Sequence, residues 1–249
     1  MDARDRLTAV LVTCAGPTRL AAKRALEQQT LGHTSAIVAN VTPMDRAFQA
    51  MIDAVATPYF VQVDEDMILH PDALQRMLAV MEHADVRTWQ IAFPLFDSHL
   101  QRLILGCKIY RTDVARQYPY RSSPSCEVDQ YRRAEKDGYA VIRMPLTDDW
   151  VVGSHEVPPD PRVTFERYLR LARKCRARGT RWLGDIPRQM LARDPMSQQD
   201  ALALAGWCVG WLTNGQPTER DHRHPDPEWS LLAPYLDGIE PKRRTVRGG

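Results

Sequence analysis

The chain has 249 residues, and 33 Lys and Arg against 31 Asp and Glu give it a formal net charge of only +2 at pH 7. This length is enough to bury a sizeable core, as one large α/β domain or as a domain with an appendage. The near balance of charge does not favour a protein that coats nucleic acid. No stretch approaches the ~20 apolar residues of a membrane span.

Cysteine usage and the N-terminal residues indicate the compartment. The 5 cysteines are odd in number, and none is spaced as a CxxC or other metal-binding pair, so we expect reduced, mostly buried thiols. Residues 1–6 are charged, and the apolar stretch after them is too short for a signal peptide. The sequence therefore predicts a cytoplasmic protein, with peripheral membrane association as the alternative.

The first part of the chain alternates between strand and helix patterns. The predicted elements are, in chain order, a buried strand over 7–13, a turn over 14–19, a helix over 20–29, a strand over 36–41 and a helix from Pro43 to Val55. Thr42 is the expected N-cap of that helix, with Pro43 at its first position. The first turn holds too little glycine for a P-loop or a dinucleotide fingerprint.

An acidic segment, Asp64–Asp66, ends the next apolar run. Val61 and Val63 precede it with strand periodicity, and Pro71 follows at a plausible first position of a helix. Carboxylates at the C-terminal end of a buried strand lie where open α/β sheets bind ligands. An Asp-x-Asp pair offers the oxygen ligands that Mg²⁺ or Mn²⁺ prefers when it carries a diphosphate. The alternative interpretation is that Asp64 and Asp66 only cap the following helix.

Further alternation follows and sets the expected fold class. The predicted elements are strands over 89–93 and 103–110 with a polar loop or hairpin between them, a helix over 126–137 ended by Gly138, and a strand over 139–145. Repeated β/α alternation favours an α/β fold with a mainly parallel, doubly wound sheet. We expect a catalytic core over residues 1–157 and a helical C-terminal extension over 158–249.

The C-terminal extension is strongly basic in its first helix, predicted over 164–179. A solvated face is the expected explanation; contact with an acidic acceptor, a membrane surface or nucleic acid is the alternative. A second helix over 197–212, capped by Ser197 with Asp200 and stopped by Asn214-Gly215, is expected to pack on the core. His222–His224 read as solvated, and residues 242–247 as a flexible tail.

Four landmarks in order give the chain a family resemblance. The landmarks are Thr18-Arg19 after the first strand, Val63–Asp66, Glu127–Asp129 followed by Gly138-Tyr139, and Gly153–His155. Their order is more specific than any one of them. On these residues the chain resembles the nucleotide-sugar glycosyltransferases of the GT-A fold, most nearly glycosyltransferase family 2, over roughly residues 7–157.

The resemblance implies roles for particular residues. Asp64 and Asp66 would hold Mn²⁺ or Mg²⁺ on the diphosphate, and His155 would complete the metal or phosphate site. Asp148, Asp149 and Glu156 are nearby alternatives to His155, since hard metals accept carboxylates.

A downstream carboxylate would activate the acceptor hydroxyl. Counting back from Gly138, the family's basic aspartate falls on Glu127, and Cys126 replaces the glutamate before it. We favour Glu127 over Asp129 as the base; both could instead only stabilise a helix N-terminus.

The donor pocket is expected at the first turn and at the end of the second strand. The candidate nucleotide contacts are Thr13, Ala15, Arg19, Asn40, Arg46 and Asp64. Arginine can stack on a base or pair with a phosphate. Asn40 departs from the acidic residue common in relatives, which leaves the base open, with UDP favoured.

The sequence therefore predicts a metal-dependent glycosyltransferase that moves a sugar from a nucleoside diphosphate sugar to a hydroxyl acceptor of unknown class. Inversion at the sugar carbon is favoured over retention. The alternatives are a nucleotidyltransferase, which would release pyrophosphate, and a non-catalytic module that binds nucleotide sugars or nucleic acid.

Overall fold

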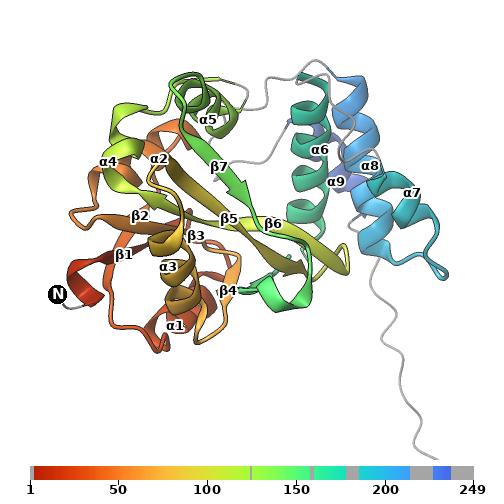
Figure 1. Cartoon of the computed structure of the whole chain (residues 1–249). Helices are drawn as coiled ribbons and strands as arrows, with labels where there is room; N and C mark the ends of the chain where they lie inside the picture. The colour runs from red at the N-terminus through yellow and green to blue at the C-terminus, as the bar shows by residue number, and fades with distance from the viewer. Residues whose placement is uncertain (1–2, 124, 158–159, 178–184, 214–226, 237–249) are drawn as a thin grey trace, which may run out of the picture.

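The computed structural model describes residues 3–123, 125–157, 160–177, 185–213 and 227–236 (Figure 1). The predicted helix stop at Asn214-Gly215, His222–His224 and the tail over 242–247 lie outside these residues. The strands are β1 Leu7–Thr13, β2 Thr34–Ala39, β3 Tyr59–Asp64, β4 Met67–Leu69, β5 Thr88–Asp97, β6 Arg102–Arg111, β7 Ala140–Arg143 and β8 Gly153–His155. The helices are α1 Arg19–Glu27, α2 Met44–Asp53, α3 Ala73–His83, α4 Thr112–Gln117, α5 Cys126–Lys136, α6 Pro161–Ala177, α7 Ile186–Leu191, α8 Gln198–Leu212 and α9 Pro227–Leu236.

The strands of the described part form one sheet in the order β2-β1-β3-β6-β5-β8-β4, and β7 also pairs with β5. Strand β1 is parallel to both β2 and β3, and β5 is parallel to both β7 and β8. Strand β6 runs antiparallel between β3 and β5, and β4 is antiparallel to β8. The prediction of a mainly parallel α/β sheet is confirmed.

Helices cover both faces of this sheet. Successive residues of a strand point to opposite faces, so Leu11 of β1 joins a core with helices α1 and α3, while Val10 joins a core with α2, α4 and α5. Trp89 and Phe60 are fully buried in the second core. Burial on both faces explains why these strands read as continuous apolar runs.

Several predicted boundaries were wrong, and one error concerns the acidic segment. We expected a strand-to-helix crossover there, but Met67–Leu69 form β4, and α3 begins only at Ala73. The reason is long-range, because β4 pairs with β8, which comes from much later in the chain. The N-cap of α2 is Pro43 rather than Thr42, and no side chain caps that helix. Helices α4, α7 and α9 were not predicted.

The C-terminal helices α6, α7 and α8 build a core of their own beside the β5–β6 hairpin (Figure 1). Helices α6 and α8 pack closely because α8 presents Gly206 and Gly210 to the backbone of α6. A Cβ on Gly206 would lie 2.1 Å from the carbonyl oxygen of Phe165. The predicted capping box of Ser197 and Asp200 at the start of α8 is confirmed.

The expectation of a solvated basic face on α6 was wrong for Arg167, Arg170 and Arg173, which form ion pairs within the protein, while Arg176 is exposed. Arg173 is buried and pairs with Glu228 of α9, and Arg170 lies 2.8 Å from Glu166. Arg176 donates to the carbonyl oxygens of Trp211 and Thr213, at 2.9 and 3.0 Å. Arg173 and Arg176 thereby join α6 to α9 and to the end of α8.

Two further expectations can be compared with the described residues. All the cysteines are free; Cys107, Cys126 and Cys175 are buried, Cys14 is half-buried and Cys208 is exposed, as predicted for mostly buried thiols. Each helix in the described ranges is too short or too polar to cross a bilayer.

Candidate active site

The carboxyl end of β3 carries the acidic segment, and its first residue is held in the sheet. Gln62 Nε2 donates to Asp64 Oδ1 at 3.1 Å, while the Tyr110 hydroxyl donates to the other end of the same amide at 3.0 Å. Burial, followed by the charge of Asp66, raises the pKa of Asp64 to about 6. Asp64 is therefore a carboxyl group that a nearby cation would stabilise in its charged form.

The middle residue of the segment, Glu65, points to a different place. Its carboxylate accepts hydrogen bonds from the Thr13 hydroxyl and from the backbone N–H of Gly16, the latter at 2.7 Å. The Thr13 oxygen in turn accepts from the N–H of Ala15, which has a positive φ of 64°. Glu65 thus fixes the turn between β1 and α1, where we expected nucleotide contacts.

The third residue, Asp66, meets His155. The register of β4 and β8 pairs Met67 with His155, and His155 Nε2 lies 3.1 Å from Asp66 Oδ2. The N–H of Glu156 donates to the Asp66 carbonyl oxygen at 2.7 Å and continues the pairing. The other carboxylate oxygen, Asp66 Oδ1, is buried without a hydrogen-bond partner.

Asp97 and Arg167 complete this cluster from two other elements. His155 Nδ1 donates to Asp97 Oδ2 at 3.1 Å, and Arg167 Nη2 donates to the same oxygen at 2.9 Å. Burial alone would raise the pKa of Asp97, yet the His155 hydrogen bond and the Arg167 charge lower it to about 2. Burial alone would lower the pKa of His155, yet its bonds to Asp66 and Asp97 raise it to about 9.

A second charged pair lies on the α5 side of Asp64. Lys108 of β6 forms an ion pair with Glu127 of α5, and the charges of both reach Asp64: Lys108 lowers its pKa and Glu127 raises it. Asp129 instead forms an ion pair with Arg133 one turn along the same helix, at 2.9 Å. The structure therefore brings Glu127, rather than Asp129, into the electrostatic surroundings of Asp64.

The remaining predicted residues lie around this centre. Asn40 follows β2 with a φ of 56°, and its N–H donates to the Thr13 carbonyl oxygen at 2.8 Å. Arg19 begins α1 and Arg46 lies in α2, and both side chains are exposed. Asp148 and Asp149 form a short 3-10 turn with exposed side chains, and Glu156 accepts from Ser154 at 2.6 Å.

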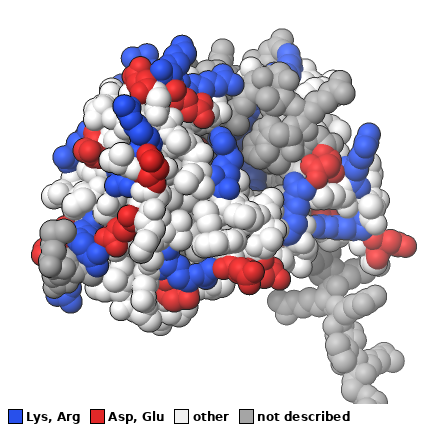
Figure 2. Space-filling view, in the orientation of Figure 1, with Lys and Arg blue, Asp and Glu red and all other residues white. Residues whose placement is uncertain are grey.

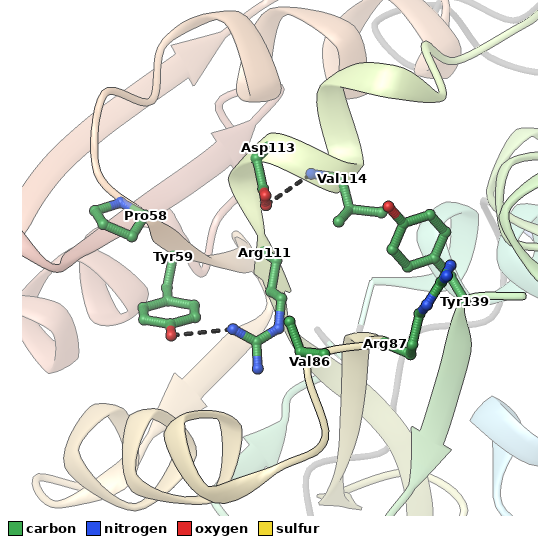
Figure 3. A pocket seen from close by; sticks show the side chains of 8 residues that line it. All are labelled: Pro58, Tyr59, Val86, Arg87, Arg111, Asp113, Val114 and Tyr139. Carbon is green, nitrogen blue, oxygen red and sulfur yellow. Dashed lines mark hydrogen bonds between the residues drawn. The ribbon is translucent and has the colours of Figure 1, made fainter.

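A cavity of about 430 Å³ lies elsewhere, by the start of β3 and the end of β6 (Figure 3). Arg111 and Arg87 line it with Tyr59 and Tyr139. Arg111 donates to the carbonyl oxygens of Thr88, Met81 and Ala84, and its guanidinium lies 5.4 Å from the Tyr59 ring. This arginine holds the end of α3, and the cavity is on the opposite end of β3 from the acidic segment.

Sequence reasoning missed Lys108, Asp97 and Arg167. A lysine within the apolar run of β6 was a usable signal, because a charge inside a buried strand needs a partner. Asp97 ends the apolar run of β5 much as Asp64 ends that of β3, but we placed it in a polar loop. Nothing near Arg167 distinguishes it from the other arginines of α6.

The Asp66–His155 pair has the chemistry of a site for a hard divalent ion. The buried Oδ1 of Asp66 is an oxygen without a hydrogen-bond partner among the described residues. Carboxylate and imidazole both suit Mn²⁺. Among the described residues no group of three or more His, Cys, Asp or Glu is arranged as a metal site. Two protein ligands fit an ion that takes its other oxygens from water and phosphates.

No protein-family model matches the sequence, and no curated protein matches it. Among solved structures, mannosyltransferase PcManGT from Pyrobaculum calidifontis, in complex with GDP-Man and Mn²⁺, has a TM-score of 0.52 at 13% identity, over 95% of this chain and 81% of that one. Glucosyl-3-phosphoglycerate synthase from Mycobacterium tuberculosis, with Mg²⁺ and UDP, has a TM-score of 0.49 at 10% identity, over 70% and 80%. A 4-diphosphocytidyl-2C-methyl-D-erythritol synthase from Anaerococcus prevotii is more distant, with a TM-score of 0.43 at 4% identity, over 59% and 89%. The expected resemblance is confirmed at the level of the fold: the chain has the fold of the GT-A glycosyltransferases.

Proposed function

We propose that this protein is a metal-dependent glycosyltransferase that moves a sugar from a nucleoside diphosphate sugar to a hydroxyl group. The observation that carries the proposal is the meeting of Asp66 and His155, 3.1 Å apart, at the carboxyl end of β3 in a GT-A fold. Ligands of open α/β sheets bind at this end of the strands.

Asp66 and His155 would hold Mn²⁺ or Mg²⁺, with Asp64 beside them. When bound, the ion supplies positive charge to the diphosphate of the donor and stabilises it as the leaving group. Asp64, whose carboxyl is held by Gln62, would orient the ribose or a metal-bound water. PcManGT, which shares the fold, was solved with GDP-Man and Mn²⁺.

The turn between β1 and α1 would receive the nucleotide. Thr13 and Ala15 are held by Glu65, and Asn40 is bonded to the same turn. Arg19 and Arg46 are exposed and available to a base or a phosphate. UDP is our favoured nucleotide, and GDP is the first alternative because a structure of the same fold holds it.

Glu127 would act as the general base. The acceptor oxygen attacks the anomeric carbon of the sugar, the acceptor proton passes to the Glu127 carboxylate, and the nucleoside diphosphate departs with the electrons of the broken C–O bond. Attack on the face opposite the leaving group inverts the configuration at that carbon. Lys108, paired with Glu127, would orient the carboxylate.

The charge distribution does not favour the nucleic-acid-binding alternative. On the face seen in Figure 2, acidic and basic side chains are interspersed rather than segregated. Arg167, Arg170 and Arg173 of α6 form ion pairs within the protein. A membrane surface stays an alternative partner of the protein, as the place where the acceptor would be met.

Product identity tests the proposed function. We would incubate the full chain with a panel of UDP- and GDP-sugars and Mn²⁺, with water as a minimal acceptor, and separate the products by chromatography. Release of nucleoside diphosphate that stops on addition of EDTA is the expected result. Pyrophosphate release from nucleoside triphosphates would show a nucleotidyltransferase instead. Binding of donors without any product under these conditions and with candidate acceptors would indicate a non-catalytic module.

A further inference from the structure

Asp97 is a fully buried carboxylate with 0% exposure at the end of β5, outside every residue that sequence reasoning assigned to the site. We propose that Asp97 is a positioning residue: it fixes the His155 ring so that Nε2 faces Asp66 and a bound metal ion. This inference rests on the proposed function, because it concerns the same metal site.

One oxygen of Asp97 is committed to its own turn. Oδ1 accepts hydrogen bonds from the backbone N–H groups of His99 and Leu100, at 3.0 and 2.7 Å. Two donors on one oxygen fix the plane of the carboxylate, since moving it would leave buried N–H groups without partners. The second oxygen is therefore aimed in one direction only.

That second oxygen, Oδ2, faces His155 and Arg167. It accepts from His155 Nδ1 at 3.1 Å and from Arg167 Nη2 at 2.9 Å. Arg167 Nη2 also lies 3.2 Å from Nδ1, and Asp66 faces Nε2 as a second carboxylate, so the metal-free ring carries a proton on each nitrogen. Because a carboxylate can only accept, Asp97 would keep the proton on Nδ1 when a metal ion replaces the one on Nε2. The Arg167 guanidinium offsets the buried negative charge of Asp97.

The C-terminal helices hold the turn that follows Asp97 through contacts with His99. Tyr168, next to Arg167 on α6, has its hydroxyl 3.0 Å from His99 Nδ1, and the other ring nitrogen of His99 lies 3.3 Å from Asp200 of α8. Arg193 donates to the His99 carbonyl oxygen at 2.6 Å. The turn that carries Asp97 is thus bonded to α6, to α8 and to the segment before α8.

Substitution of Asp97 by asparagine tests the inference with almost no change of shape. The two turn N–H groups need an oxygen, so the amide oxygen of Asp97→Asn would take the Oδ1 position and its NH₂ group would face His155. An NH₂ group donates, which favours the ring form with the proton on Nε2, the atom needed by the metal. We expect Mn²⁺ affinity to fall by about 10- to 100-fold.

Mn²⁺ binding would be measured on the full chain from the electron paramagnetic resonance signal of the free ion, with the metal alone and with UDP or GDP. Ser98→Ala is the matched control, because the Ser98 hydroxyl lies in the same turn and accepts from the N–H of Val157 at 3.0 Å. The substitution keeps the backbone N–H of residue 98, which donates to the His155 carbonyl oxygen at 3.0 Å. Its affinity is expected to stay within about twofold of wild type.

A double-mutant cycle separates positioning from a general structural effect. If Asp97 acts through His155, Asp97→Asn has no further effect on Mn²⁺ affinity once His155→Ala is present. Equal affinities of Asp97→Asn and wild type, or losses that add in the double variant, would overturn the inference and leave the proposed function intact. Absence of Mn²⁺ binding in the wild type under all conditions would reject the proposed metal site itself.

One measurement uses no variant at Asp97, so its result does not depend on whether Asp97→Asn folds. In wild-type protein labelled with ¹⁵N histidine and loaded with Mg²⁺ and UDP or GDP, two-bond proton–nitrogen spectra report which ring nitrogen carries the proton. His155→Ala identifies the His155 signals. A proton on Nδ1 and none on Nε2 is expected, and the reverse would contradict the positioning role.

Discussion

Asp64 and Asp66 are separated by one residue, yet their surroundings shift their pKa values in opposite directions. Burial and the neighbouring charge of Asp66 raise the pKa of Asp64 to about 6. Burial also acts on Asp66, but the hydrogen bond and charge of His155 outweigh it and lower its pKa. Without a metal, the protonated imidazole of His155 supplies the positive charge between the carboxylates of Asp66 and Asp97. Asp66 is therefore the carboxylate most suited to accept a metal in exchange.

Asp66→Ala should remove metal-dependent transfer, with a loss of at least about 100-fold, because the ion would lose a charged ligand. The fold should persist, since β4 is held by backbone pairing to β8. The measurement is nucleoside diphosphate release against Mn²⁺ concentration, with the thermal midpoint as a check. Asp72→Ala, at a side chain that is 55% exposed, is the control and should retain activity. Full activity of Asp66→Ala in EDTA would contradict the metal assignment.

Glu127→Gln should lower kcat by about 10²- to 10⁴-fold, because an amide cannot accept the acceptor proton. Binding of the donor, measured by calorimetry, should change little. Asp129→Asn is the matched comparison on the same helix; its partner is Arg133, so we expect activity close to wild type. If the two phenotypes are exchanged, Asp129 is the base and Glu127 only holds Lys108.

At the scale of elements, the contact between the acidic segment and the first turn is tight. A Cβ added to Gly16 would lie 2.7 Å from Glu65 Oε1, closer than van der Waals contact allows. Gly16→Ala should therefore displace the Glu65 carboxylate from its bonds to the turn and raise the KM for the donor. The loss of stability should be small, because the clashing atoms belong to the end of a flexible side chain. Gly32→Ala is the control, since its Cβ would have only Arg4 nearby, at 3.6 Å. Equal donor KM values in the two variants would show that the turn does not bind nucleotide.

Elements with a strong local pattern were predictable. The first strand, the helix that starts near Cys126 and the capped helix from Ser197 all follow from periodicity and caps that lie within the segment. Strands β4 and β8 were not predictable, because three residues carry no period and each strand exists only through pairing with distant chain. The same limit explains the shifted start of α3.

The candidate site divides in the same way. Asp64, Asp66 and His155 were named from strand ends and the order of landmarks, and the structure places His155 against Asp66; their roles in catalysis stay a prediction. Asp97 and Arg167 were not named, because what sets them apart is a contact between β5, β8 and α6. The partners of the α6 arginines were unpredictable for the same reason, since Glu228 and Thr213 approach only in the folded chain.

At the scale of the molecule, the close packing of α6 against α8 supports the turn that carries Asp97. Gly206→Ala would place a Cβ 2.1 Å from the Phe165 carbonyl oxygen, and the two helices must separate. We expect a loss of about 1–3 kcal/mol in the free energy of unfolding and weaker Mn²⁺ binding, although Gly206 is not in the site. Calorimetric unfolding and Mn²⁺ titration check this. Lower stability with unchanged Mn²⁺ affinity would show that the C-terminal helices do not influence the site.

The insertion of β8 between β5 and β4 sets the order in which the site can be assembled during folding. Asp66 emerges early in synthesis, but its partner His155 belongs to a strand that must dock between two strands already made. Contacts between segments so distant in sequence form late, because the intervening chain must be ordered first. A nascent chain that ends before β8 therefore has the acidic segment without His155. The proposed metal site is complete only when β8 has paired with both β5 and β4.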